Sequence, residues 1–72
     1  MRRYDTPLER AHRHVQDAEH RVREQAERIE NMRSAGHDTR TAEEMLLVFE
    51  QALEIMRAHR AFVEHRERGH SI

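Results

Sequence analysis

The chain has 72 residues, of which 38% are charged and none is cysteine. A chain this short buries a modest fraction of its surface, and without cysteine it forms neither disulfides nor thiolate metal sites. Its stability must therefore come from regular helix packing or from oligomerisation. Thirteen basic residues against fourteen acidic ones give a formal net charge of −1, which removes the argument for nucleic-acid binding that a strongly basic domain would supply.

Apolar runs long enough to span a bilayer are absent from the sequence, and the N-terminus leads into polar residues without the apolar core of a signal peptide. We therefore expect one soluble, cytoplasmic domain. Gly36 and Gly69 are the only glycines, so the chain has no glycine-rich phosphate loop. Two helices also offer no concave pocket for a substrate. We expect a protein that is not an enzyme and that uses no cofactor.

A first helix is predicted at about residues 7–35. Thr6-Pro7-Leu8-Glu9 is a capping box with proline at the first helical position, which fixes the start. Beyond it, alternating spacings of three and four residues form a heptad pattern, which predicts one inward stripe. The residues of this stripe are Leu8, Ala11, Val15, Ala18, Val22, Gln25, Ile29 and Met32.

A turn at about residues 36–38 is predicted to join this helix to a second one at about 39–67, followed by a frayed tail at 68–72. Gly36 can adopt the left-handed conformation that ends a helix, and Asp38 or Thr39 can cap the next one. So short a connection forces the helices to be antiparallel neighbours. The predicted fold is all-α, a single coiled-coil-like hairpin.

The two helices have unequal apolar surfaces. The first has an apolar arc of roughly 120° and the second one of roughly 200°. Part of the second arc can pack on the first helix, through Leu46, Phe49, Leu53, Met56 and Val63. The remainder, called here the outer apolar face, is predicted to be a dimer interface and consists of Met45, Val48, Ala52, Ile55, His59 and Phe62.

A contiguous apolar patch on a soluble chain usually marks an interface. The simplest partner is a second copy related by a two-fold axis, and we predict a homodimeric four-helix bundle. The alternatives to a homodimer are that a helix of another protein covers this face or that the hairpin stays a monomer.

Seven histidines are the most unusual feature of the composition. The core positions are aliphatic, which argues against a preformed metal site in a bundle, so most histidines are expected on the surface. A zinc site that uses His14 and His59 is the alternative. Counting from the turn places His59 at a seam position opposite Val15 and near His14. There it is either a half-buried packing residue or a pH-responsive group, since a histidine ordinarily titrates at about pH 6.5.

Charge is unevenly distributed along the hairpin. Residues 1–14 and 57–72, the open end, hold eight arginines and four acids, a charge of +4, whereas residues 15–56 hold five arginines and ten acids, a charge of −5. One interpretation is that the open end meets an anionic partner, such as the acidic surface of an unidentified protein or a phosphate backbone. Alternatively, it helps to set the dimer register against the acidic middle of a second copy, or it has no such role. Few aromatic residues are present for stacking on bases, which argues against nucleic acid. The open-end arginines are Arg2, Arg3, Arg10, Arg13, Arg57, Arg60, Arg66 and Arg68.

The stretch Gly36-His37-Asp38-Thr39, followed by Ala42-Glu43, Leu46, Phe49-Glu50 and His59-Arg60, resembles a group of short uncharacterised helical-hairpin proteins of alphaproteobacteria. In that group a Gly-His-Asp-Thr turn joins two charged helices. The resemblance implies a bacterial, cytoplasmic origin and the same turn architecture. It implies no reaction.

The function predicted from these features is a non-enzymatic protein-protein interaction or regulatory module that acts as a homodimeric hairpin. The alternative is a metal- or pH-sensing helical bundle that uses the histidines of the open end.

Overall fold

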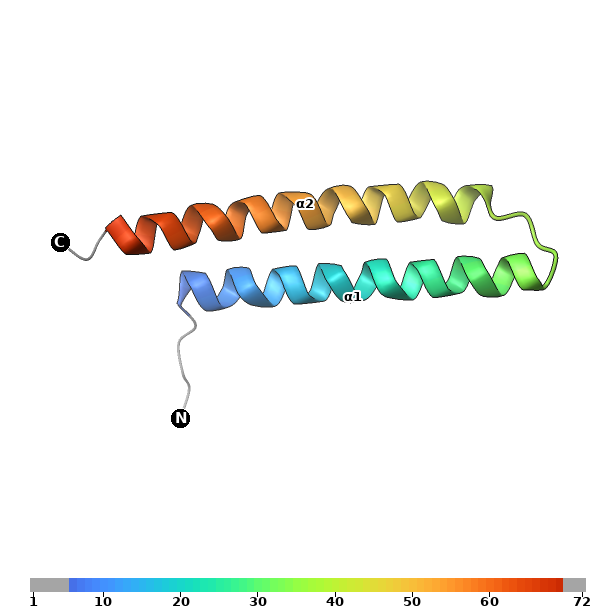
Figure 1. Cartoon of the computed structure of the whole chain (residues 1–72), viewed down its shortest axis with the longest axis horizontal. Coiled ribbons are helices and arrows are strands. Elements are labelled where there is room, and N and C mark those ends of the chain that lie inside the picture. Colours follow the sequence, from blue (N-terminus) through green and yellow to red (C-terminus); the bar gives the residue numbers. More distant parts are fainter. Residues whose placement is uncertain (1–5, 70–72) are drawn as a thin grey trace, which may run out of the picture.

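The computed structural model describes residues 6–69. It consists of helix α1, Pro7–Ser34, and helix α2, Arg40–Gly69, which lie side by side and antiparallel (Figure 1). At about 1.5 Å per residue the helices are about 42 and 45 Å long. The predicted all-α hairpin is confirmed.

The N-terminus of α1 has the predicted capping box. The Thr6 hydroxyl oxygen accepts from the Glu9 amide at 3.0 Å, and the Thr6 amide donates to the Glu9 carboxylate at 3.0 Å. Pro7 follows at the first helical position, where a missing amide hydrogen costs nothing.

The C-terminus of α1 is closed by Gly36, whose φ is +79°. The His37 amide donates to the Met32 carbonyl at 2.8 Å and the Gly36 amide to the Arg33 carbonyl at 3.1 Å, which is the Schellman pattern. The helix therefore ends at Ser34 with Ala35 as its C-cap, one residue earlier than the sequence predicted.

The start of α2 uses both predicted capping residues in different ways. The Asp38 carboxylate accepts from the Arg40 amide at 3.0 Å, whereas the Thr39 carbonyl accepts from the Glu43 amide at 2.8 Å. The Thr39 hydroxyl also donates to the Glu43 carboxylate at 3.0 Å. The helix itself begins at Arg40, one residue later than predicted.

The C-terminus of α2 lies beyond the predicted boundary. Arg68 and Gly69, placed in the frayed tail by the sequence, are helical, and the rest of that tail, 70–72, lies outside the described residues. Figure 1 shows that α2 extends past the beginning of α1 at the open end.

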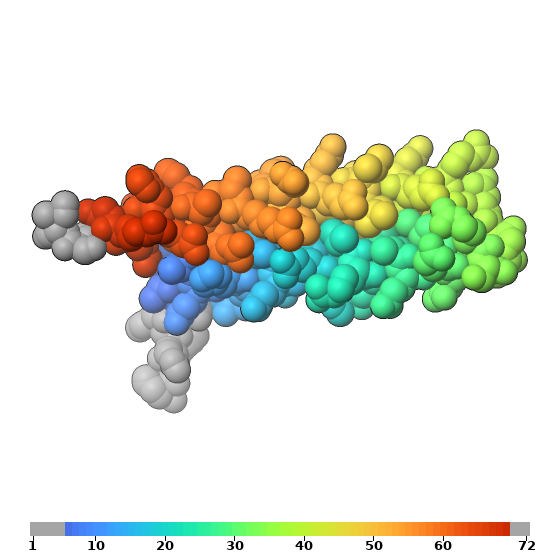
Figure 2. Space-filling model, viewed as in Figure 1, coloured from blue at the N-terminus to red at the C-terminus, as the bar shows by residue number. Residues whose placement is uncertain are grey.

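The core is a narrow strip between the helices, which contact each other along their length (Figure 2). Val15, 1% exposed, forms a buried cluster with Ala18 and Leu53, and Val22 and Met56 pack against it. The inward stripe of α1 thus follows the heptad pattern. The buried apolar side chains of the described chain are Ala11, Val15, Ala18, Ile29, Ala42, Leu53 and Val63.

One polar side chain is buried in this strip. Gln25 is 4% exposed, and its Nε2 donates to the Ala42 carbonyl at 2.9 Å. Between residues 6 and 69, buried side-chain nitrogen and oxygen atoms all have hydrogen-bond partners. Within the same range, neither helix is long and apolar enough to cross a membrane.

Candidate functional site

The outer apolar face lies largely uncovered along α2. Ala52 is half-buried and His59 is exposed. The large apolar members are all well exposed, at 44% for Met45, 59% for Val48, 65% for Ile55 and 56% for Phe62. Isolated exposed apolar residues are normal on protein surfaces, but a row of them along one helix is a candidate interface.

One end of this face is bounded by a cation. The guanidinium carbon of Arg66 lies 5.7 Å from the centroid of the Phe62 ring, within the range of a cation–π interaction. Because Arg66 follows Phe62 by four residues, the pair lies on one side of α2. Phe62 stays 56% exposed beside this cation.

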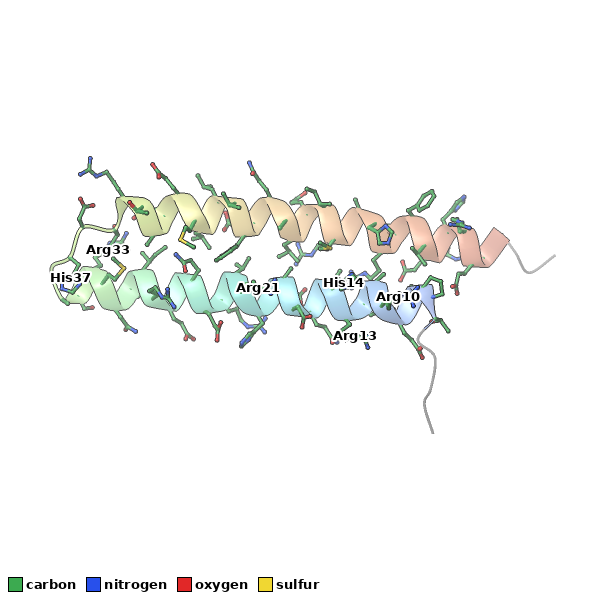
Figure 3. The ribbon with its side chains drawn as sticks, turned by 180° about the vertical axis from the view of Figure 1, so that it is seen from behind. Arg10, Arg13, His14, Arg21, Arg33 and His37 are labelled. Atoms are coloured by element: carbon green, nitrogen blue, oxygen red, sulfur yellow. The ribbon has the colours of Figure 1, made fainter. Side chains whose placement is uncertain are left out.

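Ion pairs close one edge of the hairpin. Arg33 donates to the Glu43 carboxylate at 2.7 Å near the turn, and Arg57 lies 3.4 Å from that of Glu19 further along. Both pairs join α1 to α2, and Arg33 is labelled at the turn end of α1 in Figure 3. Because their side chains are substantially exposed, each contributes little to stability, about 0–1 kcal/mol.

The edge of the hairpin on the other side of the inward stripe has a shallow groove between the helices. On a helical wheel of about 100° per residue, Arg21 lies on the other side of the inward stripe of α1 from Glu19 and Arg33. A shallow groove of about 220 Å³ runs between the helices there, lined by Arg21, Glu24, Gln25, Arg28, Met45 and Phe49. Met45 belongs to the outer apolar face, so that face adjoins this edge.

A second depression lies at the turn end and has a volume of about 460 Å³. Its lining comes from α1 and the turn alone, and it is open to solvent, so a small molecule there would keep most of its surface in water. It consists of Glu24, Glu27, Arg28, Asn31, Met32, Ala35 and His37.

The turn contains a local electrostatic arrangement. The Arg40 guanidinium donates to the Asp38 carboxylate at 2.9 Å, and together with the hydrogen bond from the Arg40 amide it lowers the pKa of Asp38 below its ordinary value. The same contact raises the pKa of Arg40. Both groups are at the surface, and their contact supports the cap of α2.

The histidines between residues 6 and 69 do not gather into a metal site. His14, labelled on α1 in Figure 3, and His59 on α2 are both exposed, and across residues 6–69 no three histidine, aspartate or glutamate side chains are placed to share an ion. His70 lies outside the described range. The zinc hypothesis for His14 and His59 gains no support from this arrangement.

The sequence-based position of His59 needs a correction. It was expected close to the inward stripe and half-buried, but it is exposed in this hairpin. At that level the inward residues of α2 are Arg60, which is half-buried, and Val63, which is buried. His59 belongs to the outer apolar face alone.

Five of the described open-end arginines have interactions within the chain. Arg57 pairs with Glu19 and Arg66 lies over Phe62, and Arg10, Arg13 and Arg68 also have interactions. Arg2 and Arg3 lie outside the described residues. An anionic partner at this end therefore stays a prediction.

One feature escaped the sequence analysis. The hydrogen bond from Gln25 to Ala42 was missed because a glutamine in a heptad stripe reads as a tolerated polar substitution. Leu47 is 60% exposed, and nothing in the structure explains it. Comparisons with protein-family models, with curated proteins and with solved structures find no match, and the likeness to the alphaproteobacterial hairpins stays a prediction.

Proposed function

We propose that this chain is a non-enzymatic protein-protein interaction module that acts as a homodimer, with the outer apolar face of α2 as the contact surface. In this arrangement two hairpins form a four-helix bundle. The proposal rests on the exposed row of Met45, Val48, Ile55 and Phe62 along one side of a single helix.

The small core of one hairpin supports the same proposal. Of its seven buried apolar side chains three are alanines, which contribute little buried area. A small domain with so modest a core rarely has more than about 3–5 kcal/mol of stability without disulfides, metals or a partner. Covering the outer apolar face would add several large side chains to the core of each copy, at about 1.5–3 kcal/mol for each one fully buried.

Molecular mass in solution tests the proposal. At micromolar concentration we expect light scattering to give twice the 8.7 kDa of the chain. Ile55→Glu places a charge in the centre of the outer apolar face, so this variant should be monomeric and should lose helicity by circular dichroism. A fully helical wild-type monomer would contradict homodimerisation, as would an unchanged mass for Ile55→Glu.

Leu47→Glu is the matched control. Leu47 is as exposed as the members of the outer apolar face, at 60%, but on the helical wheel it lies on another side of α2. The same chemical change there should leave the dimer mass unaltered. If both glutamate variants dissociate equally, the effect is one of general helix destabilisation and the proposed surface is wrong.

A further inference from the structure

The outer apolar face of α2 has the spacing of a second heptad stripe. Positions 45, 48, 52, 55, 59 and 62 alternate by three and four residues, as do the positions that turn toward α1, which are 42, 46, 49, 53, 56, 60 and 63. At 3.5 residues per turn the two stripes lie roughly 100° apart around α2. A helix in a square four-helix bundle has its two neighbours at about this angle. The pattern of α2 is therefore that of a helix with one neighbour besides α1.

The side of α1 next to the outer apolar face is polar. This favours a second α2 over a second α1 as the helix that packs on the outer apolar face. The groove between the helices already brings Arg21 and Arg28 of α1 close to Met45 of α2. A second α1 laid on the outer apolar face would press arginines onto it, whereas a second α2 would present matching apolar side chains. The residues of this side of α1 are Arg10, His14, Asp17, Arg21, Glu24 and Arg28.

We propose that a second copy of the chain docks on the outer apolar face with its α2 antiparallel to the first α2. This inference rests on the proposed homodimer and adds its direction. Two isologous arrangements bring the same face of α2 together, one parallel and one antiparallel. Side-chain volume and charge both favour the second.

Side-chain volume favours the antiparallel arrangement. In it, Met45 of one copy faces Phe62 of the other, Val48 faces His59 and Ala52 faces Ile55. Each layer then combines a larger with a smaller side chain, or an imidazole with an aliphatic group, which fills space evenly. In the parallel arrangement each residue opposes its own copy, so that Ala52 leaves a gap and two His59 rings meet.

Charge favours the same direction. The open end carries +4 and the remainder of the chain −5. Antiparallel copies lay the basic end of one hairpin along the acidic part of the other, whereas parallel copies bring two basic ends together, and like charges repel.

The available area is sufficient for a stable complex. The whole face of the hairpin, which is the outer apolar face of α2 together with the adjoining polar side of α1, is about 45 Å long and two helix diameters, about 20 Å, wide, and so covers about 900 Å². Stable protein interfaces bury about 800 Å² on each partner. Two hairpins stacked face to face therefore reach the ordinary size without any further element.

Spin labels on single cysteines test the direction, since the chain has no cysteine of its own. Glu44→Cys lies near the turn end of α2 and His65→Cys near the open end, both exposed and on the side of α2 away from α1. In the antiparallel dimer, label pairs at the same residue should be about 30–40 Å apart, and a mixture of the two labelled chains should add a distance below about 20 Å.

Gln51→Cys is the control near the middle of the stripe, exposed on the same side of α2. Its label pair should be closer than about 20 Å in either direction of packing. Short distances at 44, 51 and 65 alike would overturn the antiparallel arrangement while keeping the dimer. A dimeric mass with a long distance at 51 would show that another surface is used, and a monomeric mass would refute the proposed function together with this inference.

Discussion

At the scale of single residues, Gln25 links the two helices by a bond with a defined direction. An apolar side chain in the heptad stripe could slide along α2 at little cost, but the amide of Gln25 reaches one carbonyl, that of Ala42. A buried polar group of this kind favours one register over its neighbours. The bond therefore contributes to the alignment of the helices as well as to their stability.

Substitution of Gln25 should measure the contribution of this bond to stability. Gln25→Ala loses the hydrogen bond and leaves a void, so we expect the free energy of unfolding in urea to fall by about 1–2 kcal/mol at fixed protein concentration. Gln25→Leu keeps the volume and should stay within about 1 kcal/mol of wild type, because the Ala42 carbonyl retains its intrahelical bond. Wild-type stability in Gln25→Ala would show that the bond contributes nothing.

Asp38 should give the turn a dependence on pH. Hydrogen bonds from Arg40 lower the pKa of this carboxyl below 3.8, so the ionised form is favoured in the folded state. Its contribution to stability is full above the ordinary pKa and is lost as the pH falls through the lower folded value. We expect Asp38→Ala to melt at a lower temperature than wild type at pH 7, and the difference to shrink toward pH 3. A difference that stays constant to pH 3 would mean that Asp38 acts without its charge.

At the scale of the elements, the helix ends depend on local geometry that sequence describes well. The capping box of Thr6 and Glu9 and the reversal at Gly36 were predicted from residue types alone, and the helix boundaries differ from prediction by one or two residues. The inward positions of α2, such as Leu53, were predicted from periodicity. These features depend on a few neighbouring residues, which is why the sequence reveals them.

The position of His59 shows where this reasoning failed. Counting from the turn gave the correct level along α2, but one residue corresponds to about 100° of rotation. Arg60, the next residue, lies toward α1, whereas His59 lies on the outer apolar face. The direction of a side chain depends on how the two helices are rotated against each other, which only packing of both inward stripes decides.

The two glycines should respond in opposite ways to a methyl group. Gly36 has a φ of +79° and nothing within 4 Å of the place that a methyl group would occupy, so Gly36→Ala adds backbone strain and no clash. We expect it to cost about 1–2 kcal/mol, measured by thermal melting. Gly69 is helical with equally open surroundings, so Gly69→Ala should be neutral or slightly stabilising. Equal losses in both variants would contradict a left-handed cap at Gly36.

At the scale of the whole molecule, the hairpin has one edge closed by ion pairs and one apolar face left open. The turn and the heptad stripes specify how α1 meets α2, but nothing in a single chain requires a second copy. The prediction of a dimer therefore comes from the outer apolar face of α2, which α1 does not cover. The antiparallel direction comes from the order of side chains along that face and from the uneven charge of the hairpin.

His59 interrupts this stripe with the one polar side chain among its six members, and that makes it the position where the assembly can be strengthened. His59→Leu would add an apolar side chain opposite Val48 in each of the two equivalent layers, and full burial of a leucine is worth about 1.5–3 kcal/mol. We expect the dimer dissociation constant, measured by analytical ultracentrifugation, to fall by at least about tenfold. His65→Leu, an exposed change on another side of α2, should leave it unchanged. If His59→Leu leaves the dissociation constant unaltered, or if His65→Leu lowers it as much, His59 does not lie in the contact between copies.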